Sequence, residues 1–324
     1  MTRLVLLTGA AGEVGRRLAH RLAADGFRVR ALVLPGDPLR ARLEGVVAEI
    51  REGDIRDAES LRPACAGVDT VFHLAAVILA PDPAAYDAVN RQGTANLVAA
   101  AAAAGVRHFV YVSSASVVYP RLTPYGESKL AAERIVAGET RFAHTIVRPT
   151  LVYDESGGQE FMLFRRYLLR FPVVPFIGAG QARKRPVFSG DVVDGLARIA
   201  GNDVSFGRTY NLSGGETVTL GELGRLVLGL EGKSRPFLPL PVSLCRAVAA
   251  VLGRVMRNPP ITPYAIAGFT NHADLDPAQA VAELGYRPRG VRAGLTACFE
   301  PIAASATRGQ STNRAVRPAD GSAR

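Results

Sequence analysis

The chain of 324 residues has no tryptophan and few cysteines and histidines, and each shortage excludes a class of protein. Its three cysteines are odd in number and far apart, which excludes a disulfide framework and a paired-cysteine zinc site. The five histidines are scattered, without the HxxxH or HExxH spacing of zinc enzymes. We therefore expect no bound metal. The cysteines are Cys65, Cys245 and Cys298.

Lysine is also scarce, since it supplies only 3 of the 39 Lys and Arg residues of a chain with a net charge of +10. Alanine is abundant too, so the high arginine content indicates a GC-rich gene as much as a requirement for positive charge. No dense basic stretch is interleaved with aromatic residues, so the sequence predicts no nucleic-acid partner. An acidic small molecule, such as one that carries a diphosphate, suits the charge equally well.

Long hydrophobic runs are missing as well. The least polar stretches, near residues 70–80 and 94–106, are shorter than the roughly 20 residues that a membrane span needs. The first residues lack the apolar core and cleavage site of a signal peptide. These features predict a cytoplasmic protein without a transmembrane segment, and they leave open a peripheral membrane contact and a homodimer.

The first 150 residues alternate short apolar runs, which predict strands, with helical stretches. The longest predicted helix, Ala84–Ala104, stops at Gly105, as is typical of a helix C-terminus. This alternation indicates an α/β fold with a parallel sheet covered by helices on both faces. The predicted strands are Leu4–Leu7, Val29–Val33, Val46–Arg51, Thr70–Leu74, Phe109–Ser113 and Thr145–Arg148.

The alternation ends after Pro149, which predicts a second and smaller α+β domain that closes a cleft over the sheet. We place the first domain at residues 1–155, with 186–212 returning to it. The second domain then comprises residues 156–185 and 213–302. Residues 303–324 are small, polar and basic without periodicity, which predicts a disordered tail.

The strongest local pattern follows the first strand, where LVLLTGAAGEVG places Gly9, Gly12 and Gly15 in a GxxGxxG spacing. Glycine permits a positive φ and lets backbone amides approach a pyrophosphate at a helix N-terminus. A glycine triplet alone also occurs in plain strand–helix turns. Its place at the first strand and first helix of a βαβ unit favours dinucleotide binding.

A second pattern is the YxxxK of Tyr125 and Lys129. Residues four apart share one face of a helix. An ammonium beside a phenol lowers the pKa of the phenol, so that a tyrosine can exchange a proton near neutral pH. Lys129 is the only lysine among the first 183 residues of an arginine-rich chain, which indicates that arginine cannot replace it. A solvated helix start is the alternative.

With these two motifs the sequence resembles the extended, epimerase/dehydratase-like branch of the short-chain dehydrogenase/reductase superfamily, over about residues 3–300. The resemblance implies a Rossmann-type doubly wound parallel sheet and an NAD(P)-dependent enzyme. It makes Tyr125 the acid/base on a substrate hydroxyl or carbonyl, and Lys129 a ligand of the nicotinamide ribose too. It gives a serine the hydrogen bond to the reacting oxygen. Ser114 is our first choice for that catalytic role, with Ser113 and Ser116 as alternatives that contact the substrate.

The resemblance also implies where the cofactor binds. Asp54 follows the third predicted strand, where the family contacts adenine, although it could instead cap the next helix. His73 fits a structural role better than a catalytic one, and Asn90 matches a supporting asparagine. The residues implied to bind the cofactor are Gly9, Gly12, Glu13, Val14, Gly15, Asp54, Ile55, Leu74, Ala75, Ala76, Tyr125, Lys129 and Pro149.

The choice between NAD and NADP stays open. Family members that use NAD often carry an acid at the end of the second strand, where it accepts a ribose hydrogen bond. Here that strand ends without one, and Arg30 and Asp37 are ambiguous indications. NAD is favoured if the protein is an epimerase.

The substrate class rests on weaker patterns. The basic run 183–185, with Arg185, could clamp a diphosphate, or it could be a solvated turn. The possible diphosphate clamp favours a nucleotide sugar as the substrate. The C-terminal half, which is similar to bacterial sugar epimerases and 4-ketoreductases, favours it too. The alternative, which we place second, is a steroid-like or other lipophilic hydroxyl or ketone. The apolar helices Phe161–Phe171 and Val242–Met256 favour it, although such faces usually form core. A non-catalytic sensor or scaffold is less consistent with a complete Ser/Tyr/Lys set.

Overall fold

Seven parallel strands form the central sheet, in the order β11-β6-β5-β4-β1-β2-β3. The computed structural model describes residues 3–80, 82–154, 158–256 and 261–299. The predicted parallel sheet is confirmed, and its order reverses between β1 and β4, where ligands of such sheets bind. The strands are β1 (Leu4–Thr8), β2 (Arg28–Val33), β3 (Glu49–Glu52), β4 (Thr70–His73), β5 (His108–Val112), β6 (Ala143–Pro149) and β11 (Arg208–Leu212).

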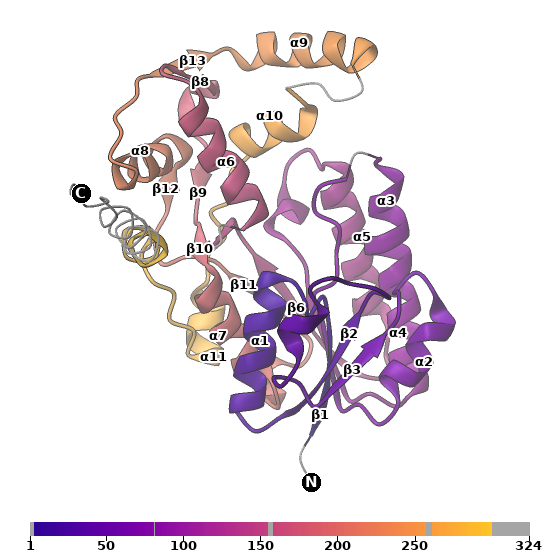
Figure 1. Ribbon diagram of the computed structural model, residues 1–324. Helices are drawn as coiled ribbons and strands as arrows, with labels where there is room; N and C mark the ends of the chain where they lie inside the picture. Colours follow the sequence, from indigo (N-terminus) through magenta and orange to yellow (C-terminus); the bar gives the residue numbers. More distant parts are fainter. Residues whose placement is uncertain (1–2, 81, 155–157, 257–260, 300–324) are drawn as a thin grey trace, which may run out of the picture.

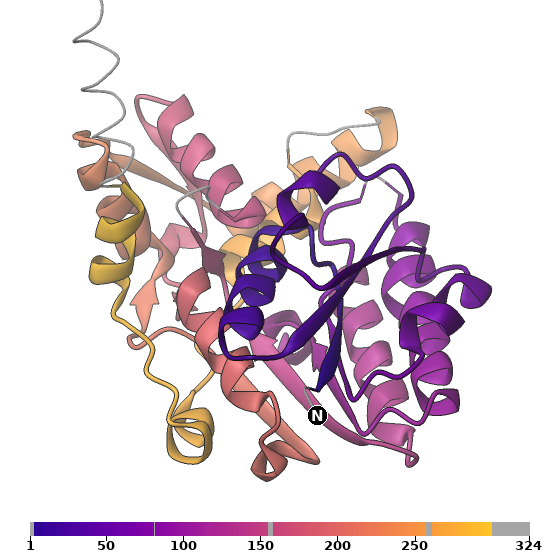
Figure 2. The ribbon, with the colours of Figure 1, turned by 60° about the horizontal axis from the view of Figure 1, so that its bottom comes forward.

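Helices cover both faces of the sheet, because the strands carry apolar side chains on both sides. One face holds α1 (Glu13–Ala24), α7 (Ser189–Ile199) and α11 (Ala278–Leu284). The other holds α2 (Ala58–Cys65), α4 (Thr94–Ala103) and α5 (Pro124–Gly138). Figures 1 and 2 show these two layers on opposite sides of the sheet, and together we call them the large lobe.

A small lobe lies beyond the carboxyl ends of the strands (Figure 1). Its own apolar core joins helix α6 to helix α8 and strand β8, and a second cluster joins α9 to α10. Its labelled helices are α6 (Gln159–Arg170), α8 (Leu220–Leu230), α9 (Val242–Val255) and α10 (Pro263–Thr270), and residues 291–299 are helical as well. Its two-stranded sheets pair β8 (Val174–Ile177) with β13 (Phe237–Leu240), β9 (Arg183–Lys184) with β12 (Val218–Thr219), and β7 (Val152–Tyr153) with β10 (Val187–Phe188).

Two predicted elements differ from those observed. The predicted helix 84–104 consists of α3 (Ala84–Tyr86), a π-helical segment η2 (Asp87–Gly93) and α4, and it ends before Gly105, which has φ +70°. Predicted strand 46–51 starts only at residue 49, because the amides of Val46 and Val47 donate to the Leu43 carbonyl in a turn. That turn follows the short 3₁₀ helix η1 (Arg40–Leu43); the others are η3 (Ala115–Val118), η4 (Gly178–Gly180) and η5 (Asp203–Ser205).

The C-terminal part of the chain contributes to both lobes. Strand β11 pairs with β6 at the sheet edge, and α7 packs on α1, so residues 187–212 lie mainly in the large lobe. Helix α11 lies within residues 213–302, which we assign to the second domain from the sequence. It packs instead on α7 and β11, because its buried residues Ala280 and Leu284 complete their apolar face. The predicted tail at 303–324 lies outside the described residues.

Two absences hold for the described part of the chain. None of its helices combines the length and the apolar character needed to cross a membrane. Nor do its His, Cys, Asp and Glu side chains gather into a group of three or more that could hold a metal ion. The three cysteines are all buried.

Candidate active site

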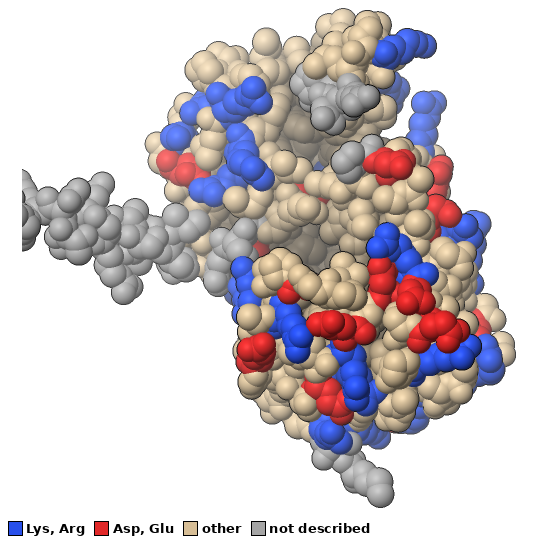
Figure 3. Space-filling view, turned by 45° about the vertical axis from the view of Figure 1, so that its right-hand side comes forward, with Lys and Arg blue, Asp and Glu red and all other residues tan. Residues whose placement is uncertain are grey.

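A cavity of about 880 Å³ lies at the carboxyl ends of β1, β2, β4 and β5, between the two lobes. Figure 3 shows the surface hollowed between the lobes. The cavity wall contains nearly all the site residues predicted from the sequence; Ser116 and Arg185 are absent from it. The predicted residues on the wall are Gly9, Gly12, Glu13, Val14, Gly15, Asp54, Ile55, Leu74, Ala75, Ala76, Ser113, Ser114, Tyr125, Lys129 and Pro149.

The glycines of the β1–α1 loop leave no space for side chains. Gly9 has φ +68°, and a β-carbon there would lie 2.7 Å from the backbone nitrogen of Ala75. A β-carbon on Gly15 would lie 2.1 Å from the Gly9 carbonyl oxygen. Gly12 precedes the first turn of α1, whose free amides face the cavity. The loop therefore brings bare backbone and a helix N-terminus to one wall, as a pyrophosphate requires.

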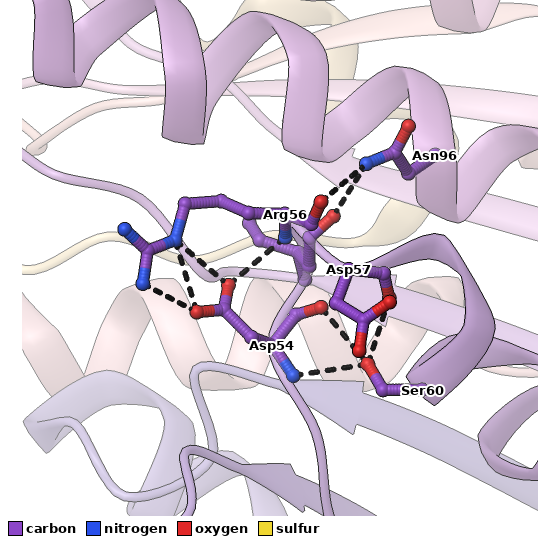
Figure 4. Close-up of polar contacts among 6 residues, drawn as sticks. Asp54, Arg56, Asp57, Ser60 and Asn96 are labelled. Atoms are coloured by element: carbon purple, nitrogen blue, oxygen red, sulfur yellow. Dashed lines mark hydrogen bonds and ion pairs between the residues drawn. The ribbon is translucent and has the colours of Figure 1, made fainter.

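The β3–α2 loop forms the wall at the other side of the β2 end. Figure 4 shows the polar contacts that hold this loop. The Asp54 carboxylate accepts hydrogen bonds from the backbone amide and guanidinium of Arg56, which lowers its pKa. The Ser60 hydroxyl donates to the carbonyls of Asp54 and Asp57, and Asn96 donates to the Ile55 carbonyl. Asp57, rather than Asp54, caps α2. The loop is thus fixed with Asp54 and Ile55 on the cavity wall.

The two ambiguous residues near β2 have different surroundings. Arg30 is buried, and its guanidinium donates to Glu49 and to the carbonyls of Ala64 and Ala66. It belongs to the packing of β2 against β3 and α2. Asp37 lies on the cavity wall, where its carboxylate accepts the Leu39 amide at 2.8 Å. An acidic residue therefore does lie near the end of β2, a turn later in the chain than in family members that use NAD.

The β4 loop is held by Asn90, which is 1% exposed and lies in the π-helical segment. Its side chain donates to the Val77 carbonyl and to Ser128, both at 3.0 Å, and accepts the Val77 amide at 2.8 Å. Asn90 thereby ties the loop after β4 to helix α5. π-Helical turns are frequent at functional sites. His73 bridges the hydroxyls of Thr8 and Thr94, and burial lowers its pKa to about 3, which suits a structural role.

Tyr125 and Lys129 project from one face of α5 into the cavity. The Lys129 amine donates to the Val112 carbonyl at 2.7 Å and lies 4.3 Å from the centre of the Tyr111 ring. Lys129 is 2% exposed, and burial lowers its pKa to about 7 against an opposing effect of Glu133. A lysine in this environment can hold or release a proton near neutral pH.

The pKa of Tyr125 differs from the sequence-based prediction. Burial raises it above the ordinary value, the charge of Glu160 raises it further, and a hydrogen bond with Ser114 opposes the rise. The predicted lowering by Lys129 is not observed, because the phenol is nearly enclosed and the amine is directed at Val112. The raised pKa favours the protonated phenol at neutral pH.

The three candidate serines occupy different positions. Ser114 lines the cavity beside Tyr125, and its hydroxyl accepts hydrogen bonds from the amide and hydroxyl of Ser116. Ser116 is thus behind Ser114, away from the wall. Ser113 also lines the cavity, and its buried hydroxyl has no hydrogen-bond partner within the described residues. The arrangement places two serine hydroxyls, from Ser113 and Ser114, on the wall.

The basic run 183–185 lies apart from the cavity. Arg183 forms an ion pair with Asp274 at 2.9 Å, and Arg185 donates to Thr217 at 3.0 Å and faces Asp276 at 3.5 Å. The Lys184 amine donates to the Asn271 carbonyl, and burial lowers its pKa to about 8. These side chains fasten β9 to the segment after α10.

The small lobe adds two groups that the sequence analysis missed. Glu160, in the first turn of α6, lines the cavity, and the Tyr264 hydroxyl from α10 donates to its carboxylate. Burial raises the pKa values of Tyr119 and Tyr125, and the charge of Glu160 raises them further. No sequence pattern could pair Glu160 with Tyr264, because they are 104 residues apart.

Comparison with known proteins agrees with this geometry. The family model described as NAD(P)H-binding matches residues 9–166. An N-acetyl-alpha-D-glucosaminyl-diphospho-ditrans,octacis-undecaprenol 4-epimerase of Escherichia coli O157:H7 is 30% identical over 261 residues, which cover 74% of this chain and 76% of the relative. The chain belongs to the NAD-dependent epimerase/dehydratase branch of the short-chain dehydrogenase/reductase superfamily.

Two further relatives carry the names of a dehydrogenase and a reductase. The 3-beta-hydroxysteroid dehydrogenase of Mycolicibacterium neoaurum is 28% identical over 324 residues, covering 88% of this chain and 87% of the relative. The ceramide reductase of Caulobacter vibrioides is 34% identical over 174 residues, 54% of each chain.

Two solved structures share the fold over most of the chain. The crystal structure of gox2253 has 28% identity and a TM-score of 0.78, with 95% of this chain and 99% of that one covered. MoeE5 in complex with UDP-glucuronic acid and NAD has 25% identity and a TM-score of 0.71, with 93% and 99% covered.

As a member of this superfamily, the protein is an NAD(P)-dependent enzyme of the epimerase/dehydratase or dehydrogenase/reductase type, and its cavity fits the dinucleotide. Side chains at Gly9 and Gly15 would occupy the loop that faces the pyrophosphate. Asp37, Asp54, Lys129 and Pro149 line the same cavity and are the residues that would hold the rest of the dinucleotide. NAD(P), when bound, accepts or returns a hydride.

Proposed function

We propose that the protein is a dehydrogenase or reductase of a lipophilic hydroxyl or ketone. The observation that carries the proposal is the charge at the substrate end of the cavity. Glu160 brings an acidic side chain close enough to Tyr125 to raise its pKa. Such a charge repels a diphosphate and tolerates a neutral substrate.

The basic side chains near the cavity already bond to other groups of the protein. Within the described residues, Arg56 and Lys129 are the Lys and Arg side chains on its wall. Arg56 is paired with Asp54 at the adenosine side, and Lys129 donates to Val112. A substrate diphosphate would require an arginine clamp, and Arg185 is held by Thr217 and Asp276.

The remaining wall near Tyr125 is largely apolar, which suits a steroid-like ring system or a lipid chain. Its apolar residues come from the loop after β4, from α3 and η2, from the end of β6 and from β7: Val77, Ile78, Ala85, Val89, Pro149 and Val152. The relatives named as a 3-beta-hydroxysteroid dehydrogenase and a ceramide reductase support this substrate class.

In this proposal the chain's own residues move one proton. The Tyr125 hydroxyl donates its proton to a carbonyl oxygen during reduction and recovers it from the hydroxyl during oxidation. Ser114 donates a hydrogen bond to the same oxygen, and Lys129 holds the ribose. Asn90 fixes α5 and the β4 loop so that these groups keep their spacing.

The cofactor that we propose is NAD. The Asp37 carboxylate on the cavity wall can accept a hydrogen bond from the ribose hydroxyl of NAD. In NADP this hydroxyl carries a phosphate, which the negative charge of Asp37 repels. Calorimetry with NAD, NADH, NADP and NADPH tests the choice. We expect binding of the NAD pair, and a shift towards NADP in Asp37→Asn. Preference of the unchanged protein for NADP would contradict the assignment.

A nucleotide sugar is the second candidate, and the complex of MoeE5 with UDP-glucuronic acid and NAD supports it. Absorbance of the reduced nicotinamide, followed with hydroxysteroids, long-chain ketones and UDP-sugars, separates the two. An epimerase shows sugar conversion without net cofactor turnover, whereas a dehydrogenase consumes the cofactor stoichiometrically.

The double variant Arg183→Gln/Arg185→Gln provides the matched control. We expect turnover of the lipophilic substrates with an unchanged KM in this variant. Activity on nucleotide sugars alone, with a KM that rises in the double variant, would replace our proposal with the second candidate.

A further inference from the structure

Helix α9 carries two apolar stripes, and only one of them is buried. Cys245 and Ala249 face inwards, where they pack with Ile177 and Ile266. The residues of a second stripe are spaced seven and four positions apart along the helix and so occupy one face. Its side chains are exposed: Leu244 by 55%, Val251 by 60% and Val255 by 74%. A surface helix ordinarily exposes a polar face, so this second stripe requires an explanation.

The apolar surface continues beyond the helix. Strand β13, which leads into α9, exposes Leu238 by 52%, and Met256 after α9 is exposed by 44%. β13 and α9 lie along the same outer edge of the small lobe, at the top of Figure 1. Exposed apolar residues therefore extend along one edge of the molecule from residue 238 to residue 256.

The chain segment that contains this edge carries charged residues of a single sign. Residues 232–273 contain no aspartate or glutamate. They contain five basic residues, which are Lys233, Arg235, Arg246, Arg254 and Arg257. The two arginines of α9, Arg246 and Arg254, lie off the apolar stripe. An apolar stripe on a helix whose charged side chains are all basic is typical of helices that lie in the surface of an anionic membrane.

We propose that α9 docks on a membrane rich in anionic lipids, with Leu244, Val251 and Val255 entering the headgroup region. The charge favours this occupant over a second copy of the chain, because a symmetric pairing of this face brings arginines against arginines. Basic side chains strengthen binding to an anionic surface, whereas salt weakens it.

The position of α9 connects the docking face to the cavity. α9 packs on α10, and Tyr264 of α10 donates to Glu160 on the cavity wall. A membrane against α9 therefore lies beside the elements that border the substrate end. If the substrate is lipophilic, as we propose, it can enter the cavity from the membrane. The docking of α9 itself does not depend on the proposed function.

Co-sedimentation of the full chain with vesicles tests the proposal. One set of vesicles contains phosphatidylcholine alone, and the other contains equal parts of phosphatidylcholine and phosphatidylglycerol. We expect binding to the mixed vesicles, weaker binding to the neutral ones, and a loss of binding at high salt. No binding to the mixed vesicles at low salt would overturn the proposal.

The triple variant Leu244→Ser/Val251→Ser/Val255→Ser should reduce partitioning into the mixed vesicles by at least about tenfold. These side chains are more than half exposed, so we expect an unchanged unfolding midpoint, which is measured alongside. Val204→Ser/Val281→Ser removes two exposed valines from the large lobe and should bind like the unchanged protein.

Two outcomes contradict the assignment of the face. One is a triple variant that binds vesicles as well as the unchanged protein. The other is a concentration-dependent dimer that the triple variant abolishes, without any vesicle binding, which would assign the face to a second copy.

Discussion

Tyr125→Phe removes one hydroxyl group and keeps a ring that is 8% exposed and packs edge-on against Tyr86. We expect the rate to fall on the order of 100- to 10,000-fold, because the positioned acid/base is lost. The unfolding midpoint and the affinity for NAD(P) should stay unchanged. Turnover assays and calorimetry on the same preparation measure these quantities.

Ser114→Ala is the control for this prediction. It removes a hydrogen bond to the reacting oxygen and no proton donor, so its loss of rate should be smaller than that of Tyr125→Phe. Near-full activity of Tyr125→Phe on the true substrate would show that Tyr125 is not the acid/base.

Lys129 makes the stability of the folded chain depend on pH. Burial lowers its pKa to about 7 from the ordinary 10.5. Below pH 7 the amine is protonated in both states, and the cost of burying its charge is fully present. Between about pH 7 and about pH 10 the unfolded chain binds more protons, so the stability contributed by Lys129 rises with pH. Urea unfolding should therefore show the unchanged protein gaining stability relative to Lys129→Met as the pH increases.

Lys233→Met, which changes an exposed lysine, is the comparison for this experiment. Its free energy of unfolding should differ from that of the unchanged protein by a constant amount over the same range. A difference for Lys129→Met that does not vary with pH would mean that the amine keeps its ordinary pKa in the folded chain.

The β1–α1 loop is the element on which cofactor binding depends. In Gly15→Ala the new β-carbon lies 2.1 Å from the Gly9 carbonyl oxygen, so the loop must shift. Overpacking of this kind costs about 1–3 kcal/mol, and affinity for NAD(P) should fall by at least about tenfold. Gly138→Ala, where a β-carbon meets nothing within 4 Å, should bind normally in the same calorimetric titration. Equal affinities of the two variants would contradict this account of the loop.

At the scale of the whole molecule, Asp154 joins the segment that leads into the small lobe to the large lobe. It is 2% exposed and accepts hydrogen bonds from Arg17 of α1, at 2.8 Å, and from Ser189 of α7. Asp154→Ala should lower the free energy of unfolding by about 1.5–3 kcal/mol, as is usual for hydrogen bonds to a charged group. Denaturant unfolding measures the change.

The exposed ion pair of Glu59 and Arg62 provides the control for the Asp154→Ala measurement. Both side chains are more than 70% exposed, so Glu59→Ala should change the free energy of unfolding by less than about 1 kcal/mol. A similar small change for Asp154→Ala would mean that this contact does not hold the lobes together.

The sequence by itself determined the parallel sheet, the glycine loop and the spacing of Tyr125 and Lys129. Each of these depends on neighbours in the chain: apolar periodicity, the backbone freedom of glycine, and one turn of a helix. For the same reason it misplaced elements whose geometry depends on distant contacts. The predicted helix 84–104 contains a π-helical segment in which Asn90 is bonded to Val77 and Ser128.

Only the tertiary structure decided the surroundings of the reacting groups. It pairs Glu160 with Tyr264, turns Arg30 and Arg185 away from the cavity, and leaves one stripe of α9 exposed. The pKa of Tyr125 was predicted wrongly because burial and Glu160 act on it from parts of the chain that the YxxxK spacing does not describe. Charge and burial act through space, and the chain brings such groups together only when the small lobe packs over the sheet.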